Sequence, residues 1–134
     1  MTEPAKIEYF QLTVGFEFPP QSFTLDAGLV SLYLEATRDL SDLMRCEKLV
    51  PPMAVTAFAM KALSQSVTLP SGTIHVSQEL NFLKIVKIDD VITCRSKVSR
   101  KVDRGGLRLM NIDINVTNQS AEIVLTGKVG FILP

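Results

Sequence analysis

The stretch that decides the fold is PPMAVTAFAMKALSQSV, residues 51–67. Two prolines open it, which suits the first helical turn because a backbone N–H has no partner there. Apolar side chains cover most of its circumference, and Lys61 carries its only full charge. Because a helix that is apolar nearly all round is a buried helix, the stretch predicts one central helix of about 15 residues, or roughly 22 Å.

The second half of the chain alternates apolar and polar residues, which predicts β-strands. Strands are expected at 73–86, 91–102, 107–117 and 121–133. They are longer than most strands, so they suit a curved antiparallel sheet with one half-buried face. One helix against that face gives an α+β fold, a long curved sheet wrapped around the central helix. The whole chain, residues 1–134, is expected to form a single domain.

The first fifty residues predict shorter elements. Ile7–Val14 is a strand candidate, and residues 16–20 are an irregular connector. Asp26 is expected to cap a helix over residues 27–38, in which apolar residues recur at helical spacing. Residues 39–50 mix apolar and turn-forming side chains, so a loop with one helical turn is expected.

The composition excludes several classes of function. Fourteen basic residues balance fourteen acidic ones, so net charge gives no reason to expect nucleic acid or an anionic membrane as a partner. Cys46 and Cys94 have no metal-ligand spacing, and with one histidine no metal site is expected. The N-terminus does not resemble a signal peptide, and no apolar run approaches the ~20 residues of a membrane span. A cytoplasmic protein is therefore expected.

Three segments carry a resemblance to a known family: LVPPMAVTAFAMKAL (49–63), LPSGTIHVSQELNFLKIVKIDDVITCRSKVSR (69–100) and GLRLMNIDINVTNQSAEIVLTGKVGFILP (106–134). They resemble the MaoC-like hydratase/dehydratase family, especially its N-terminal-type domains, in which a Pro-Pro pair starts the helix. IDDV (88–91) resembles the family's Gly-Asp turn. The resemblance runs from about Gly15 to the end and implies the hotdog fold, a long sheet rolled around one helix.

The resemblance also implies a ligand and a reaction. The ligand is an acyl thioester of CoA or of an acyl carrier protein, so CoA or phosphopantetheine is part of the ligand and no separate cofactor is expected. The reaction, a lyase step of fatty acid metabolism, adds water reversibly to a 2-enoyl double bond. An Asp and a His five positions apart move the proton of that water. A backbone N–H at the helix start stabilises the enolate oxygen.

This sequence departs from the family pattern at two positions. Asp39 follows the run Ala36–Arg38 and stands where the family has its Asp, but five residues on the chain has Met44, which cannot carry a proton. At the helix start the family's glycine is replaced by Pro52, which has no N–H. We therefore predict a non-catalytic or substrate-holding subunit. Asp39 is either a remnant of the dyad or a turn and cap residue.

Several other side chains are candidates for contact with the ligand. The resemblance places Asn81, Phe82, Leu83 and Lys84 where the strand passes the pantetheine arm, and Met53 near the pocket mouth. Gln78 is the one polar residue in an apolar row and is expected to point between helix and sheet, where it needs hydrogen-bond partners. A basic cluster suits CoA phosphates or an acidic carrier protein, or is simply a solvated strand face. Its members are Arg95, Lys97, Arg100, Lys101, Arg104 and Arg108.

The pocket of this family usually lies at a dimer interface, so the resemblance implies a homo-oligomer or a heteromer with a catalytic hotdog subunit. Two other functions stay open. One is an active (R)-specific enoyl-CoA hydratase or acyl-CoA thioesterase that uses Asp39, His75 or Glu79 in an atypical site. The other is an acyl-CoA-sensing regulatory or scaffold protein. His75 and Glu79 share one face of a predicted strand about 13 Å apart, too far for a direct pair.

Overall fold

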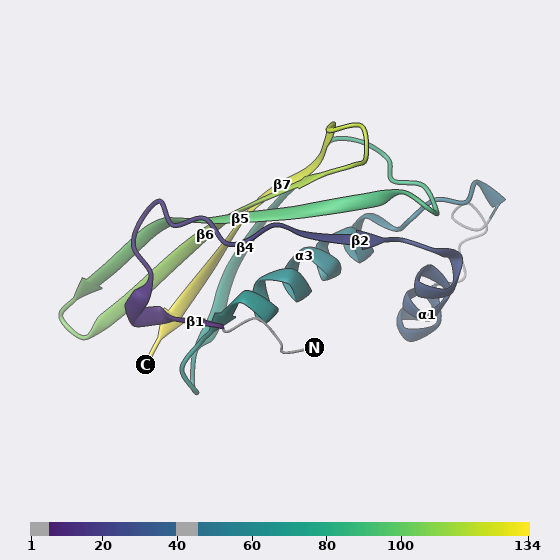
Figure 1. Cartoon of the computed structure of the whole chain (residues 1–134). Helices are drawn as coiled ribbons and strands as arrows, with labels where there is room; N and C mark the ends of the chain where they lie inside the picture. The colour runs from purple at the N-terminus through teal and green to yellow at the C-terminus, as the bar shows by residue number, and fades with distance from the viewer. Residues whose placement is uncertain (1–5, 40–45) are drawn as a thin grey trace.

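The structure, a computed structural model, describes residues 6–39 and 46–134 (Figure 1). In chain order the elements are β1 (Ile7–Glu8), a 3₁₀ turn η1 (Tyr9–Gln11), β2 (Gln21–Thr24), α1 (Ala27–Thr37), α3 (Pro52–Ser66), β3 (Val67–Thr68), β4 (Ile74–Phe82), β5 (Val91–Arg104), β6 (Leu107–Thr117) and β7 (Ile123–Leu133). No helix among these residues is long and apolar enough to cross a membrane.

Five strands form an antiparallel sheet in the order β2-β5-β6-β7-β4. Helix α3 lies along one face of it, beneath the strands in Figure 1. The alternation on β6 is as predicted, because Met110, Ile112, Ile114 and Val116 are all buried on the helix side. The arrangement is the predicted α+β fold, with the core between α3 and the inner face of the sheet.

Helix α3 begins at Pro52, with Pro51 as its N-cap, and ends at Ser66, within one residue of the predicted bounds. The prediction that it is buried all round is wrong for the described chain. Its buried side is made of Ala54, Val55, Thr56, Ala59, Ala62 and Leu63, but Met53, Ala57 and Lys61 are exposed. The exposed side of the helix includes small apolar residues such as Ala57, so the sequence pattern does not distinguish it from a buried side.

The first twenty-four residues differ from the prediction. Of the predicted strand Ile7–Val14, Ile7–Glu8 is a strand, paired in parallel with β3, and a 3₁₀ turn follows it. Strand β2 was not predicted, because four residues are too few to show a period. The preceding segment also pairs with β5, since the N–H of Phe18 donates to the carbonyl of Ser96 at 2.9 Å. The cap of α1 is confirmed: the carboxylate of Asp26 accepts the N–H of Leu29 at 2.9 Å.

A β-bulge changes which face two residues of β4 occupy. The register with β7 shifts between His75 and Ser77, so residues before the bulge are turned to the opposite side from the one predicted. His75 therefore faces the α3 side, with its ring 5.2 Å from the ring of Phe131. Glu79 pairs with Lys128 on the outer face. The two residues lie on opposite faces of the sheet, not on one face as predicted.

A second bulge, on β5 between Val98 and Arg100, turns Lys101 inward. Its Nζ donates to the carbonyl oxygens of Tyr9 at 3.1 Å and Leu12 at 2.9 Å, and it lies 4.1 Å from the Tyr9 ring. The prediction that Lys101 belongs to an outward basic face is therefore wrong. Lys101 instead holds the 3₁₀ turn against the end of the sheet.

Replacement of Gly127 by alanine should weaken the attachment of β4. A Cβ atom there would lie 2.6 Å from the backbone oxygen of Glu79 on β4, so the two strands must move apart. Overpacking of this kind costs about 1–3 kcal/mol in the free energy of unfolding, which chemical denaturation measures. Thr126→Ala on the same strand is the control and should change stability by about 0.5 kcal/mol or less. Equal stability of the Gly127→Ala and Thr126→Ala variants would contradict this packing.

Candidate active site

An apolar pocket of about 230 Å³ lies beside the start of α3. Its walls come from the segment before α3, the first turns of α3, the segment that follows β4, and the beginning of β7. The lining residues are Leu49, Val50, Pro52, Val55, Phe82, Leu83, Lys84, Ile85, Val86 and Val124. Segments far apart in the sequence thus meet where the resemblance implies a ligand.

Backbone hydrogen bonds hold these walls together. The N–H of Val50, just before α3, donates to the carbonyl of Val86 at 2.8 Å. The N–H of Leu83 donates to the carbonyl of Val124 on β7 at 2.9 Å. The position of the helix start is therefore fixed relative to the segment that follows β4.

The helix start itself is poor in donors. Pro51 is the N-cap and Pro52 the first residue of α3, and neither has an N–H. The carbonyl of Pro51 accepts the N–H of Ala54 at 2.9 Å. The first backbone N–H of the helix therefore belongs to Met53, one residue beyond the position where the resemblance implies a donor.

One charged residue lies at the rim of the pocket. Lys84 forms an ion pair with Glu122 in the turn before β7, and Asn118 Nδ2 donates to the same carboxylate at 3.2 Å. The hydrogen bond from Lys84, followed by the one from Asn118, lowers the pKa of Glu122. Lys84 is thus held at the mouth of the pocket by a carboxylate that stays ionised.

The described walls of the pocket suit an apolar chain. Among the described residues that line it, none has a carboxylate, imidazole, hydroxyl or thiol. Cys94 lies in the core, where burial raises the pKa of its thiol to about 12, so it stays protonated. Acid–base catalysis needs a group with a pKa near the working pH within hydrogen-bond reach of the substrate.

One residue of the predicted dyad position lies within the described part of the chain. Asp39 follows α1, and its N–H donates to the carbonyl of Leu34 at 2.9 Å. Asp39 is not among the residues that line the pocket. Met44 lies outside the described residues. Met53, predicted near the pocket mouth, follows Pro52 in the first turn of α3 and is 50% exposed.

The predicted ligand contacts on β4 divide into two groups. Phe82 and Lys84 line the pocket together. Asn81 pairs with Thr126 on the outer face of the sheet, and both residues line a different hollow there. Gln78 pairs with the buried Val129, which places it on the α3 side as predicted, although it is exposed.

The structure also divides the predicted basic cluster. Arg95, Lys97 and Arg100 lie on the outer face of β5, whereas Lys101 points inward. Arg104 is the last residue of β5, roughly 40 Å along the strand from its beginning. Since the pocket lies near the beginning of β5, Arg104 and the pocket of one chain lie at opposite ends of the sheet.

The sequence prediction missed most of the pocket walls. Leu83 was among the residues expected beside the ligand and does line the pocket, whereas Ile85, 68% exposed, was not expected there. The run FLKIV (82–86) was read as the continuation of a strand because it is apolar. The sequence feature that marks the end of the strand is the loss of apolar–polar alternation after Phe82.

Several solved structures have a similar fold. R-hydratase PhaJ1 from Pseudomonas aeruginosa superposes with a TM-score of 0.80 at 20% identity, covering 96% of this chain and 86% of that one. The (R)-hydratase from A. caviae gives 0.75 at 20% identity, with 92% and 98% covered. The HadBC 3R-hydroxyacyl-ACP dehydratase complex from Mycobacterium tuberculosis gives 0.70 at 17% identity, with 89% and 96% covered. The predicted hotdog fold is confirmed.

The family follows from the sequence itself. The family described as FAS1-like, dehydratase domain region, matches residues 12–127, and the chain belongs to it. Together with the structural neighbours, this confirms the predicted resemblance to MaoC-like hydratases and dehydratases. A comparison with curated proteins found no matching sequence.

Proposed function

We propose that the pocket at the start of α3 binds the acyl part of a thioester carried by CoA or by an acyl carrier protein. The observation that carries this proposal is a preformed pocket whose walls are apolar except for one lysine at the rim. Apolar walls favour burial of a hydrocarbon chain. The lysine ammonium offers a charge to the polar end of the ligand. Membership of the dehydratase family supports this class of ligand.

We further propose that the chain holds the substrate of a hydratase or dehydratase and leaves proton transfer to another subunit. Two observations support this role. The helix start lacks N–H groups at Pro51 and Pro52, and no described lining residue has a carboxylate or an imidazole. The enolate oxygen would therefore lose one stabilising donor, and the water would lose its base.

The partner that supplies these groups would bind at β4. Nearly every residue of β4 is exposed, and β4 ends the sheet with no described strand on its outer side. The opposite edge is β2, which has four residues and follows Pro19 and Pro20, which lack the N–H groups that another strand would need. The pocket wall continues from the end of β4. A catalytic hotdog subunit paired there would reach the acyl thioester.

Replacement of Leu83 by glutamate should weaken binding of octanoyl-CoA. The side chain lines the pocket and is 55% exposed, so the variant should fold while placing a carboxylate against the acyl chain. We expect the Kd measured by calorimetry to rise about tenfold, or about 1.4 kcal/mol. Free CoA should bind much more weakly than octanoyl-CoA and be affected less by the change.

Leu107→Glu is the matched control, because Leu107 is 49% exposed and lies in the hairpin at the far end of β5. This variant should bind octanoyl-CoA as the unchanged protein does. An equal loss of affinity in the two variants, or equal affinity for octanoyl-CoA and free CoA, would contradict the assignment of the pocket.

The purified chain alone should not hydrate crotonyl-CoA, because the described pocket has no acid–base group. Loss of the enoyl absorbance over time measures this reaction. Turnover by the pure chain that Asp39→Ala abolishes would overturn the substrate-holding role and favour an active hydratase. Binding of octanoyl-CoA without turnover is the expected pair of results.

A further inference from the structure

Five charged residues form one row across the outer face of the sheet. The pairing registers place Lys128 beside Glu79 and Asp113, and Lys97 between Asp113 and Glu17. Along the row the charges alternate: acidic, basic, acidic, basic, acidic. Because neighbouring strands lie about 4.8 Å apart, the row is roughly 19 Å long.

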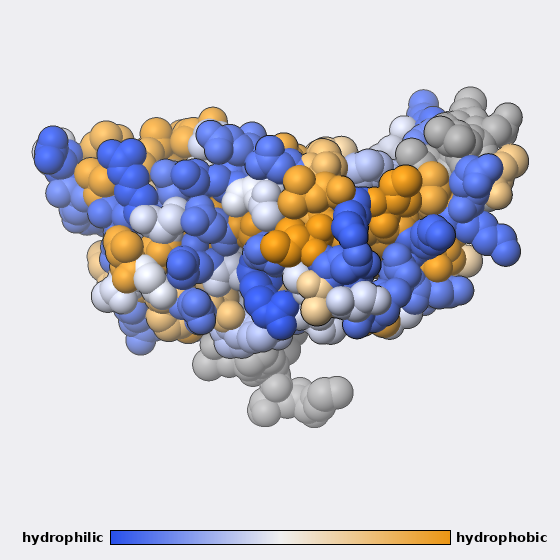
Figure 2. Space-filling model, turned by 90° about the horizontal axis from the view of Figure 1, so that it is seen from above, coloured by the Kyte–Doolittle hydropathy of each residue, from blue (hydrophilic) through white to orange (hydrophobic). Residues whose placement is uncertain are grey.

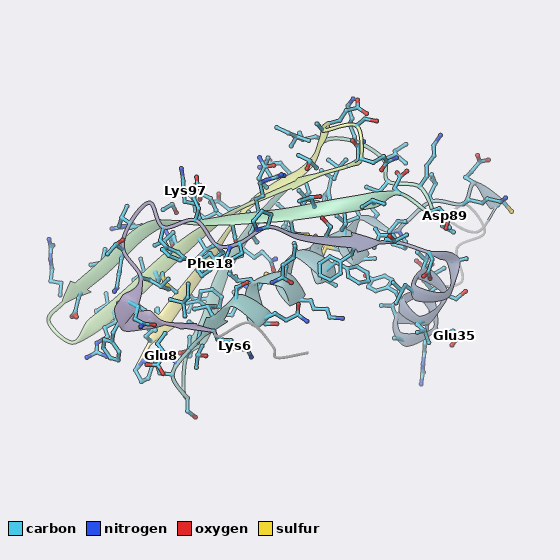
Figure 3. All side chains as sticks on the ribbon, in the orientation of Figure 1. Lys6, Glu8, Phe18, Glu35, Asp89 and Lys97 are labelled. Atoms are coloured by element: carbon cyan, nitrogen blue, oxygen red, sulfur yellow. The ribbon has the colours of Figure 1, made fainter. Side chains whose placement is uncertain are left out.

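The row lies on the side of the sheet away from α3. Ile112 and Ile114 are buried in the core, so Asp113 between them points to the other face. Figure 3 shows Lys97 on the upper side of β5, opposite to α3. All five charged residues line a hollow of about 680 Å³. Figure 2 views the protein from this side, where hydrophilic side chains cover much of the surface between apolar patches.

The charged residues of the row form no ion pair among the residues that the structure describes. Opposite charges on neighbouring strands stabilise a sheet, but among the described residues the ion pairs are Lys84–Glu122 and Arg108–Asp103, neither of which belongs to the row. Oδ1 of Asp113 is buried and has no hydrogen-bond partner. A buried carboxylate oxygen without a donor is costly, so the charge of Asp113 is incompletely compensated within the described part of the chain.

We infer that this row binds the same row of a second copy of the chain, face to face. A two-fold axis parallel to the strands and between β5 and β6 places each Lys97 opposite the other copy's Asp113. The same axis places each Lys128 opposite the other copy's Glu17. Facing sheets lie about 10 Å apart, which an extended lysine and an aspartate can span together. The interface uses the same patch on both copies.

The spacing of the row selects this partner. A small ion bound over the row would be attracted by one residue and repelled by the residue on the neighbouring strand, so its net attraction would be weak. A surface with charges that alternate at the same spacing can pair every sign, and the sheet itself is such a surface. The contact leaves both β4 edges free, so it does not depend on the proposed acyl-thioester function. Two substrate-holding chains can pair back to back while each binds a further subunit at β4.

The test is a charge swap, measured by analytical ultracentrifugation at low salt. Lys97→Asp and Asp113→Lys alone each place like charges opposite one another, so each should weaken self-association by roughly tenfold or more. The double variant Lys97→Asp with Asp113→Lys restores the pairing between copies and should return to within about threefold of the unchanged protein. Raising the salt from about 50 to about 500 mM should weaken association of the unchanged protein.

The double variant separates this contact from stabilisation within one sheet. Inside a single chain the swap puts residue 113 beside Lys128 and residue 97 beside Glu17 with like charges, so the thermal stability of the chain should not recover. Lys6→Asp, an exposed site outside the hollow, is the control and should associate normally. The series is repeated with Val76→Lys, which discourages pairing at β4.

The inference would be overturned if all variants had the same molecular mass in the ultracentrifuge. It would also be overturned if the double variant associated no better than the single variants. A mass that falls for Lys97→Asp and Asp113→Lys and recovers in the double variant would support it, in both the unchanged and the Val76→Lys background.

Discussion

The packing of α3 against the inner face of the sheet is the interaction on which the rest of the structure depends. Ala54, Ala59 and Ala62 are small and buried, so the helix lies close to strands whose inward residues are larger and branched. One helix covers only part of a five-stranded sheet. The edge strand β4 therefore stays exposed, and a pocket is left where the sheet extends past the start of the helix. Both the candidate site and the open edge follow from this coverage.

Long periodic segments could be predicted from the sequence, and the features that break a period could not. The central helix and the inward row from Met110 to Val116 follow from apolar spacing over ten or more residues. The bulges that turn His75 and Lys101 to the other face add one residue to a strand, and alternation alone does not show where such an insertion falls. Four residues of β2 gave too short a pattern, and the pocket wall after Phe82 was read as strand because it is apolar.

The candidate site was only partly predictable for a related reason. Phe82, Lys84 and Pro52 were selected and do line one pocket. Asn81 on β4 was also selected, but side-chain alternation places it on the outer face of the sheet. Arg104 was selected too, but it is the last residue of β5 and lies at the far end of the sheet. Ile85 and Val124 carry no chemical motif, so no spacing marks them. The lining residues share only their apolar character and their position around one pocket. That pocket forms when segments distant in the sequence are brought together by the fold.

The central claim is that the pocket beside Pro52 receives an acyl chain, and chemical-shift mapping of the methyl groups during titration with octanoyl-CoA tests it most directly. The account predicts that the methyl signals of Val55, Leu83, Ile85, Val86 and Val124 shift together and saturate with the ligand, and that free CoA leaves them nearly unchanged. Saturating shifts confined to other methyl groups, such as Val98 and Ile112 in the core beneath the outer face, would contradict it.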